Sequence, residues 1–158
     1  LKYRAFGDFV IFVAYAILPT LGISYITVGK FLPDLLLIIV PVGLITVAIL
    51  HANNTRDIET DVRAKISTLA MKLGKKTDIL LYIFEVIFPF LWIVGCVVLG
   101  YFPWWSLLTM LGLLPAIANA RAMLRLPKEG ISAISNLDEK TAKLQLLFSL
   151  LFTVTFLI

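Results

Sequence analysis

Long apolar stretches separated by shorter polar segments set the pattern of this sequence. The apolar stretches cover residues 9–29, 35–52, 79–99, 104–120 and 142–158. A helix that crosses about 30 Å of hydrocarbon at about 1.5 Å per residue needs roughly 20 such residues. The pattern therefore predicts an all-α, polytopic bundle with five transmembrane spans, of which the last looks short.

The third and fourth spans are separated by a turn rather than by charge. Residues 86–120 contain no charged side chain, and this run is too long for a single span. Its middle, from Gly100 to Trp105, contains a glycine, a proline and two tryptophans. This composition is typical of a turn in the aromatic belt at a membrane interface. The charged segment 53–78 then forms the loop between the second and third spans.

The composition agrees with a membrane protein. Of the 158 residues, 60% are hydrophobic and 15% are charged, and the mean hydropathy is +0.98. Soluble domains have about 45–50% apolar and about 25% charged residues. A soluble globular domain and a disordered chain are therefore excluded. One cysteine, Cys96, and one histidine, His51, exclude a disulfide framework within the chain and metal sites built from several cysteines or histidines.

Basic residues fall almost entirely on one side of the predicted membrane. If the five spans alternate, all of the 14 lysines and arginines except Lys30 lie on that side. The positive-inside rule places that side in the cytoplasm and the C-terminus outside. Basic cytoplasmic loops are ordinary in membrane proteins, so we expect membrane lipids and no nucleic acid as partners. Because the chain starts with Leu1 on a charged segment, we also expect it to be a piece of a longer protein.

The segment that follows the second span carries the candidate chemistry. Asn53, Asp57, Asp61 and Lys65 recur every four residues, which on a helix places them along one stripe. Two carboxylates one turn apart repel each other unless a cation lies between them. Carboxylate and amide oxygens without histidine or thiolate suit Mg²⁺. The nearby Arg56, Arg63 and Lys65 would bind the phosphate oxygens that the metal leaves free. A solvated helix of mixed charge with no such role is the alternative for this short pattern.

The order of these residues resembles a known motif. Residues 53–61 (NNTRDIETD), followed by Lys65, Thr68, Leu69 and Ala70, resemble the second aspartate-rich motif of the UbiA superfamily of intramembrane prenyltransferases. The order Asn-Asn-x-Arg-Asp is most similar to that of the menaquinone branch, the 1,4-dihydroxy-2-naphthoate prenyltransferases. The resemblance thus implies a transferase of prenyl groups.

A second segment carries an independent resemblance. Residues 2–8 (KYRAFGD) resemble the K-Y-x-x-x-G-D segment that the same branch has before its fifth helix. The family has nine helices, so the resemblance implies five spans of an expected nine and the C-terminal part of a single prenyltransferase transmembrane domain. The family's first aspartate-rich motif, N-D-x-x-D-x-x-x-D, has no counterpart here. We expect the missing N-terminal half of the same protein to complete the site.

The resemblance implies a reaction and roles for individual residues. The reaction is Mg²⁺-dependent transfer of a prenyl group from a prenyl diphosphate to an aromatic acceptor, 1,4-dihydroxy-2-naphthoate in menaquinone biosynthesis. It would occur within the cell membrane, with the active-site loops on the cytoplasmic side. The implied metal ligands are Asp57 and Asp61, and Lys2 is an implied catalytic contact to the diphosphate. The implied substrate-binding residues are Asn53, Asn54, Arg56, Lys65, Tyr3, which could face the allylic cation, and Asp8, which could orient Lys2 or hold the acceptor.

Three further residues invite an interpretation. Glu85 lies inside the third span, where a carboxylate is either functional or paired with a basic residue. His51 is expected to be a hydrogen-bonded histidine at a helix end rather than a catalytic base. Cys96 is expected to be a small packing residue.

Other functions stay open at this stage. A transporter or Mg²⁺ channel could use Asp57 and Asp61 as a cytoplasmic gate, although such a pathway would place polar residues in several spans and only Glu85 puts a carboxylate there. A scaffold would give these aspartates no role. Other branches of the superfamily prenylate 4-hydroxybenzoate, haem, chlorophyllide or an isoprenoid glycerol phosphate.

Overall fold

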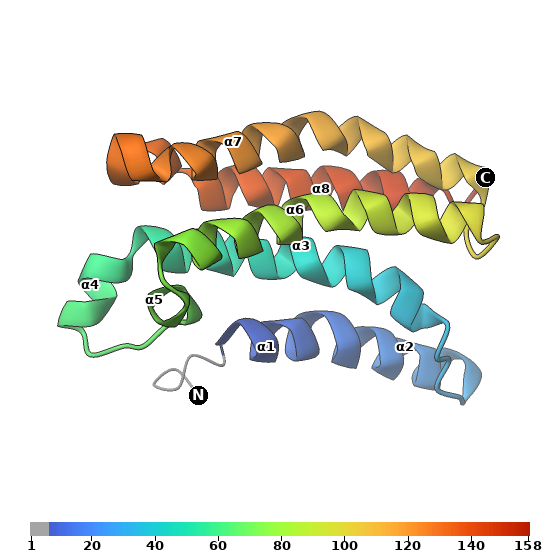
Figure 1. Ribbon diagram of the computed structural model, residues 1–158. Coiled ribbons are helices and arrows are strands. Elements are labelled where there is room, and N and C mark those ends of the chain that lie inside the picture. Colours follow the sequence, from blue (N-terminus) through green and yellow to red (C-terminus); the bar gives the residue numbers. More distant parts are fainter. Residues whose placement is uncertain (1–6) are drawn as a thin grey trace.

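Long helices run back and forth along one axis in the computed structural model, which describes residues 7–158 (Figure 1). The first span is continuous but changes helix type, because a π-helical turn joins two α-helical pieces. The remaining long helices alternate in direction, and the connection between α3 and α6 contains two short helices, α4 and α5. The elements are α1 (Gly7–Phe12), η1 (Val13–Ile17), α2 (Leu18–Val28), α3 (Leu35–Arg56), α4 (Ile58–Arg63), α5 (Leu69–Leu73), α6 (Lys75–Val98), η2 (Trp104–Gly112), α7 (Leu113–Glu129), η3 (Gly130–Ile134) and α8 (Leu137–Val154).

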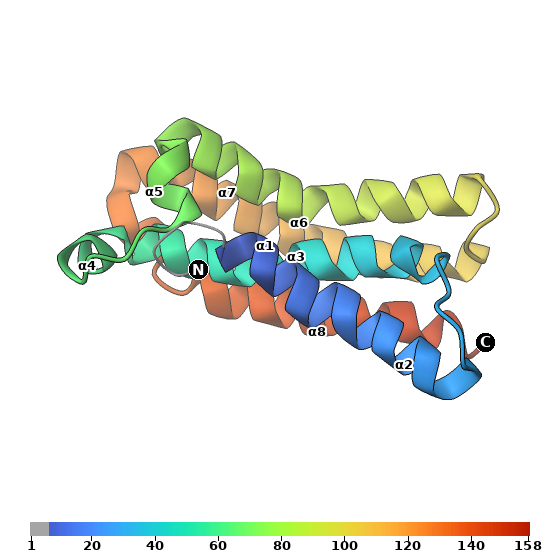
Figure 2. The ribbon, with the colours of Figure 1, turned by 90° about the horizontal axis from the view of Figure 1, so that it is seen from below.

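Four of the long helices form a bundle around a common core. Helix α3 packs against α6 and α8, and α7 packs against the same two helices from the opposite side. The first span, α1 to α2, lies mainly along α3 at the edge of this bundle (Figures 1 and 2). One close approach is made possible by Gly43, since a Cβ there would be 2.5 Å from the Phe12 ring.

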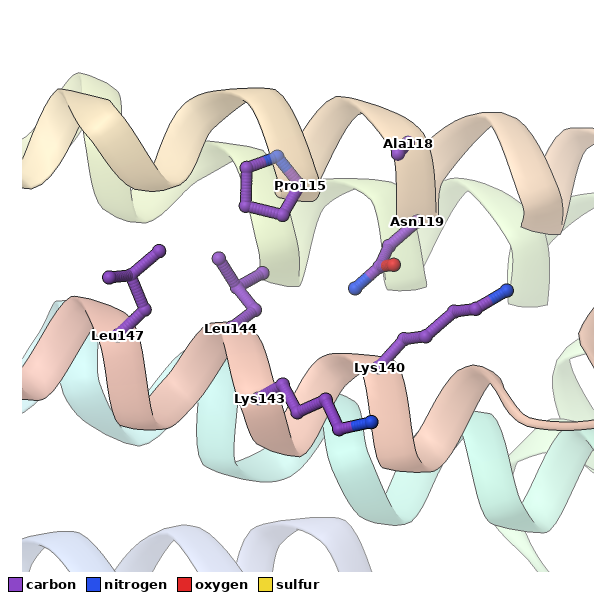
Figure 3. A pocket seen from close by; sticks show the side chains of 7 residues that line it. All are labelled: Pro115, Ala118, Asn119, Lys140, Lys143, Leu144 and Leu147. Atoms are coloured by element: carbon purple, nitrogen blue, oxygen red, sulfur yellow. The ribbon is translucent and has the colours of Figure 1, made fainter.

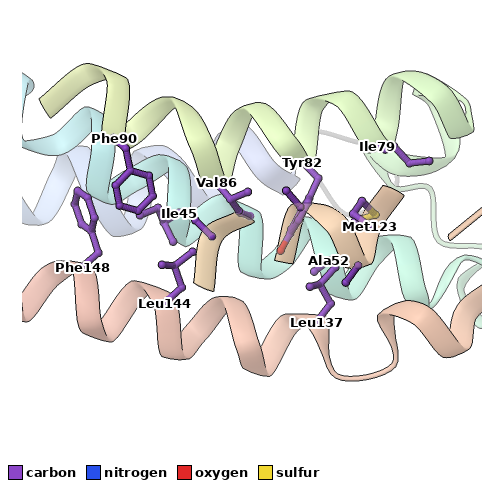
Figure 4. Packing of buried hydrophobic residues seen from close by; sticks show 14 of the residues in the cluster. Ile45, Ala52, Ile79, Tyr82, Val86, Phe90, Met123, Leu137, Leu144 and Phe148 are labelled. Carbon is purple, nitrogen blue, oxygen red and sulfur yellow. The ribbon is translucent and has the colours of Figure 1, made fainter. Parts of the chain in front are cut away.

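The core of the bundle is apolar and aromatic. Figure 4 shows side chains from α3, α6, α7 and α8 interdigitating along its length. Phe90 meets Phe148 edge to face with ring centroids 5.5 Å apart. The buried hydroxyl groups of Tyr82 and Thr141 lie 2.6 Å apart, so the polar end of this tyrosine is satisfied across the α6–α8 interface.

Two prolines coincide with changes of helix type. Pro19 lies in the first turn of α2, just after the π-helical η1, and Pro115 lies in the first turn of α7, just after the 3₁₀-helical η2. Proline lacks an N–H group and crowds the preceding turn, and local 3₁₀ or π adjustments accommodate it in membrane helices. Pro41 and Pro89 instead lie within α3 and α6.

Helical segments occupy the five predicted spans. Four helical segments are long and apolar enough to cross a membrane, namely Phe9–Val28, Leu35–Arg56, Lys75–Val98 and Trp104–Ile134. The fifth predicted span is also a helix, α8, but its first two turns carry four charged side chains and it is not among those four segments. That α8 crosses the membrane stays a prediction.

Two helices extend beyond the predicted boundaries. The fourth helical segment continues through α7 and η3 to Ile134, beyond residue 120 and the exposed Arg121 and Arg125. Charged side chains at the polar end of a helix do not break it, and α7 ends at Gly130, whose φ of 70° is readily adopted only by glycine. The motif loop is also shorter than 53–78, since α3 continues through Arg56 and α6 already begins at Lys75.

The described basic segments gather at one end of the bundle. Helices α4 and α5, the C-terminal end of α7 and the start of α8 lie at the left in Figure 1. The connections 29–34 and 99–103 and the C-terminus lie at the other end. This arrangement agrees with the alternation that the charge pattern predicts, while the side of the membrane stays a prediction.

Cysteine labelling tests the topology. Thr60 and Ser135 are exposed at the basic end, and Lys30 is exposed near the other end. In the full-length protein with Cys96→Ala, cysteines at Thr60 and Ser135 should react with a membrane-impermeant maleimide from the cytoplasm, and a cysteine at Lys30 from the opposite side. Labelling of positions 30 and 60 from the same side would contradict the alternating spans.

Candidate functional site

The end of α3 positions the first predicted site residues. Asn53 lies in the last turn of α3, and Asp57 stands at the junction with α4, where φ is −95° and ψ is 11°. The helical hydrogen bonds nevertheless continue across this junction: the Asp57 N–H donates to the Asn53 carbonyl at 3.0 Å, and the Asp61 N–H donates to the Asp57 carbonyl at 2.9 Å. The predicted stripe is therefore confirmed for Asn53, Asp57 and Asp61.

Lys65 does not belong to that stripe. Helix α4 ends at Arg63, and Lys65 has a φ of 56°, in the left-handed region. The Ile66 N–H turns back to the Asp61 carbonyl at 2.9 Å. The four-residue spacing thus correctly indicated a helix only as far as Asp61, and the chain turns before it reaches the fourth member.

Arg56 contacts three other polar side chains at the end of α3 and the start of α8. Its Nε donates to Asp57 Oδ1 at 2.9 Å, and its Nη2 donates to Asp57 Oδ2 at 3.2 Å and to the Asn53 side-chain oxygen. Its Nη1 pairs with Asp138 Oδ2 at 2.7 Å, at the start of α8. Partial burial alone would raise the pKa of Asp138, but the hydrogen bond from Arg56 lowers it below its ordinary value. One guanidinium thus ties the end of α3 to the start of α8.

The two predicted metal ligands differ in their surroundings. Both oxygens of Asp57 accept hydrogen bonds from Arg56. Within residues 7–158 the Asp61 carboxylate, which is partly exposed, has no hydrogen bond or ion pair. The described residues contain no cluster of three or more histidine, cysteine or carboxylate side chains that could hold a metal ion. These residues alone therefore offer a partial ligand set rather than a complete one.

An apolar groove begins beside this cluster. It has a volume of about 330 Å³ and is bounded by the first span, α3 and α8. Asn53 and Asp138 line its polar part, and Ile11, Ile49 and Leu50 are among the residues that line the apolar part. An amphiphile with a polar head and an apolar tail matches such a groove.

A buried polar network lies next to the site, inside the bundle. His51 Nδ1 is 2.8 Å from Glu85 Oε2, and His51 Nε2 is 2.9 Å from Asp78 Oδ1. The Thr55 hydroxyl donates to the other oxygen of Asp78 at 3.0 Å. All four side chains are buried, so this network joins α3 to α6 where water is excluded. His51 is hydrogen-bonded, as predicted, and Glu85 pairs with a basic residue rather than standing alone.

Sequence reasoning missed part of this arrangement. Asp78 was assigned to the loop, yet it is 1% exposed and shares a helix face with Glu85, seven residues later. That spacing of two carboxylates was the signal that could have found the pair. Nothing in the sequence near Asp138 indicated its contact with Arg56, because the two residues are distant along the chain. Cys96 is a buried packing residue, as predicted.

Some predicted site residues cannot be placed. Lys2 and Tyr3 lie outside the described residues, and only the backbone of Asp8 is described, at the start of α1. Asn54 lies beside Asn53 in the last turn of α3. The roles assigned to these residues stay predictions.

Fold and site together define a polytopic helical membrane protein with an ionic cluster at one end and an apolar groove beside it. Residues 1–157 match the UbiA prenyltransferase family. The chain belongs to this family, which confirms the resemblance at that level.

The relatives share this family name. The chain is 33% identical over 151 residues to the UbiA prenyltransferase domain-containing protein 1 of Gallus gallus, an alignment that covers 96% of this chain and 43% of the relative. The Mus musculus protein of that name is 32% identical over 158 residues, covering 96% and 43%. The Xenopus tropicalis protein is 42% identical over 90 residues, covering 57% and 26%. The chain thus spans less than half the length of these relatives, whose names do not specify the menaquinone branch.

The His51 network should be required for stability. In the full-length protein, His51→Leu leaves two buried carboxylates without their shared partner. The free energy of unfolding in detergent should therefore fall by about 3–5 kcal/mol. Thr46→Ala is a matched control on α3, because among residues 7–158 the Thr46 hydroxyl donates a hydrogen bond only to the Val42 carbonyl of its own helix. Adding Asp78→Asn and Glu85→Gln to His51→Leu should restore part of the loss. Unchanged stability of His51→Leu would contradict this interpretation.

Proposed function

We propose that this chain is the C-terminal part of an enzyme that transfers a prenyl group from a prenyl diphosphate to an aromatic acceptor within the membrane. The observation that carries the proposal is the ionic cluster around Arg56 beside an apolar groove. A prenyl diphosphate has the matching chemistry, because its head is charged and its tail is a hydrocarbon. Membership of the UbiA prenyltransferase family supports the same reaction class.

The charges of the cluster explain why such a site would need a cation. Arg56 is shared between two carboxylates, those of Asp57 and Asp138, and Asp61 adds a third nearby in sequence. An excess of negative charge repels a diphosphate unless a cation binds with it. Carboxylate and amide oxygens from Asp57, Asp61 and Asn53 are the donors that Mg²⁺ prefers. When bound, Mg²⁺ would stabilise the negative charge on the departing diphosphate.

Each residue of the cluster has a proposed role. Asp57 and Asp61 would hold Mg²⁺, directly or through water, and Asn53 or Asn54 would support it. Arg56 would exchange some of its present hydrogen bonds for contacts to diphosphate oxygens, to which its planar guanidinium can donate two parallel bonds. Asp138, on α8, would keep Arg56 oriented during this exchange. Lys2 and Lys65 would add positive charge around the diphosphate.

The rest of the reaction would occur beside the apolar groove. The tail of the substrate would lie along α3, between the first span and α8, and away from water. Exclusion of water protects an allylic cation from hydrolysis before the acceptor reacts. Tyr3 would face that cation with its ring, and Asp8 would orient Lys2 or the acceptor. The N-terminal half of the same protein would supply the remaining ligands.

The acceptor is the most specific part of the proposal. The sequence of residues 53–57 and 2–8 favours 1,4-dihydroxy-2-naphthoate, and hence menaquinone biosynthesis, over acceptors of other branches. The basic end of the bundle, with the site, would face the cytoplasm. A transporter or channel is less favoured, because the described buried carboxylates of the spans are paired with His51 rather than lining an open path.

Removal of the carboxylates should abolish transfer. In the full-length protein, Asp57→Asn and Asp61→Asn should each lower the rate of prenyl transfer at least about 100-fold, because the charge that compensates the developing diphosphate is lost. Glu59→Gln is a matched control, since Glu59 is an exposed carboxylate on the same short helix. The measurement is incorporation of radiolabelled prenyl diphosphate at limiting Mg²⁺. Near-full activity of either aspartate variant would contradict the metal assignment.

A competition experiment tests the acceptor. With equal concentrations of 1,4-dihydroxy-2-naphthoate and 4-hydroxybenzoate, and one prenyl diphosphate, the full-length protein should prenylate mainly the bicyclic acceptor. Chromatography of the products gives the ratio. Preferential labelling of 4-hydroxybenzoate would assign the protein to another branch while leaving the roles of Asp57 and Asp61 intact.

A further inference from the structure

A second hollow lies on the other side of α8, away from the ionic cluster. It is a cavity of about 310 Å³ between α7 and α8 (Figure 3). Its apolar part is formed by Pro115, Leu144 and Leu147, and its polar part by Asn119 and Lys140.

A neighbouring hollow adjoins this one. Ala118 lines both hollows, Lys143 also lines the first, and Arg121 and Arg125 line the neighbouring one. None of these residues belongs to the proposed active site.

Asn119 is a buried polar residue that faces this hollow. Its side chain extends from α7 toward α8 in Figure 3 and is 3% exposed. Among the described residues its Nδ2 has no hydrogen-bond partner. A buried amide donor without an acceptor is costly, by roughly 1–3 kcal/mol, so an acceptor supplied by a ligand would satisfy it.

The charges around Asn119 specify what kind of ligand would fit. Within residues 7–158, Lys140 and Arg121 make no side-chain hydrogen bond or ion pair, whereas Lys143 is already paired with Glu139 at 2.7 Å. Lys140 extends toward α7 and shares the hollow with Asn119 in Figure 3. Donors and positive charge without a compensating acceptor favour an anionic head rich in oxygen atoms.

The position of the hollow along the bundle matches the level of the lipid headgroups in a membrane. From Trp104, at the aromatic end of the fourth span, the rise per residue of the 3₁₀ and α segments places Asn119 about 27 Å farther along the helix. This distance is close to the hydrocarbon thickness of about 30 Å, so Asn119 and Lys140 would lie at the opposite interface. Leu144 and Leu147 lie farther toward the membrane interior along α8. Polar donors at the interface with apolar side chains below them match a phospholipid.

We propose that the α7–α8 groove binds one anionic phospholipid of the surrounding membrane, with its phosphate oxygens at Asn119 and Lys140 and an acyl chain along Pro115, Leu144 and Leu147. Arg121 adds positive charge from the adjoining hollow. Unlike the cluster around Arg56, this groove presents basic rather than acidic side chains. It therefore needs no metal ion to accept a phosphate group, and this distinguishes its ligand from the prenyl diphosphate of the proposed reaction.

Native mass spectrometry of the full-length protein tests this site. The protein is transferred from nanodiscs that contain equal amounts of phosphatidylglycerol and phosphatidylcholine with the same acyl chains. We expect one retained phosphatidylglycerol that survives EDTA. Lys140→Gln should lower its occupancy about fivefold, whereas Lys128→Gln, which changes an exposed lysine of α7 outside the hollow, should not.

Asn119→Leu separates lipid binding from packing. Leucine has a similar volume and removes the unpaired amide, so thermal stability in detergent should be unchanged or higher while lipid occupancy falls. A purely structural asparagine would give the opposite result, with lower stability and unchanged occupancy.

Four results would overturn the proposal. The first is equal retention of the two lipids, and the second is equal loss from Lys140→Gln and Lys128→Gln. The third is displacement of the lipid by a prenyl diphosphate in EDTA, which would assign the groove to the substrate. The fourth is protection of a cysteine at Leu147 from a lipid-soluble maleimide in the lipid-free protein. That result would show that the N-terminal half of the protein covers the groove.

Discussion

The pairing of His51 with Asp78 and Glu85 is the interaction on which the rest of the structure depends. In the interior of a membrane bundle, ionisable side chains are tolerated only when they are paired, and apolar contacts distinguish poorly between alternative helix neighbours. The two ring nitrogens of His51 fix both the rotation of α3 and its register against α6. Because Asn53 and Arg56 follow His51 within two turns of the same helix, that register also fixes the direction in which the site residues point.

Arg56 extends this constraint to a third helix. Its bonds to Asp57 and Asp138 bring the start of α8 to the end of α3, and the groove between them and the first span is formed as a result. Close packing of Phe12 and Ala16 on Gly43 brings the first span against α3 about one turn before the groove. The site therefore consists of one short segment, residues 53–61. Contacts between residues distant in sequence, namely Arg56 with Asp138 and His51 with Asp78 and Glu85, hold this segment in position.

The sequence predicted the local features well, because they depend on periodicity. Apolar stretches of about 20 residues predicted the helices, and the four-residue spacing predicted the stripe from Asn53 to Asp61. The predicted stripe fails at Lys65 because the last turn of a short helix has few hydrogen bonds to hold it. The chain turns there, and the Ile66 N–H bonds back to the Asp61 carbonyl. Helix α7 continues beyond the predicted end of the fourth span because charge marks where a helix leaves the hydrocarbon, not where the helix ends. The contact between Arg56 and Asp138 joins residues separated by about half of the chain, and no local pattern encodes such a contact.

Helix α8 separates two surfaces of opposite charge within its first two turns. Asp138 contacts Arg56 on the side of the apolar groove, whereas Lys140 extends toward α7 on the other side. Both surfaces adjoin apolar side chains, so both can accept an amphiphile with a phosphate head, and charge alone distinguishes their ligands. In the proposed reaction, the acidic side would accept a diphosphate only together with a cation, and that cation would stabilise the charge on the departing diphosphate. The basic side would accept a phosphate without a cation, and a lipid bound there would contact both α7 and α8.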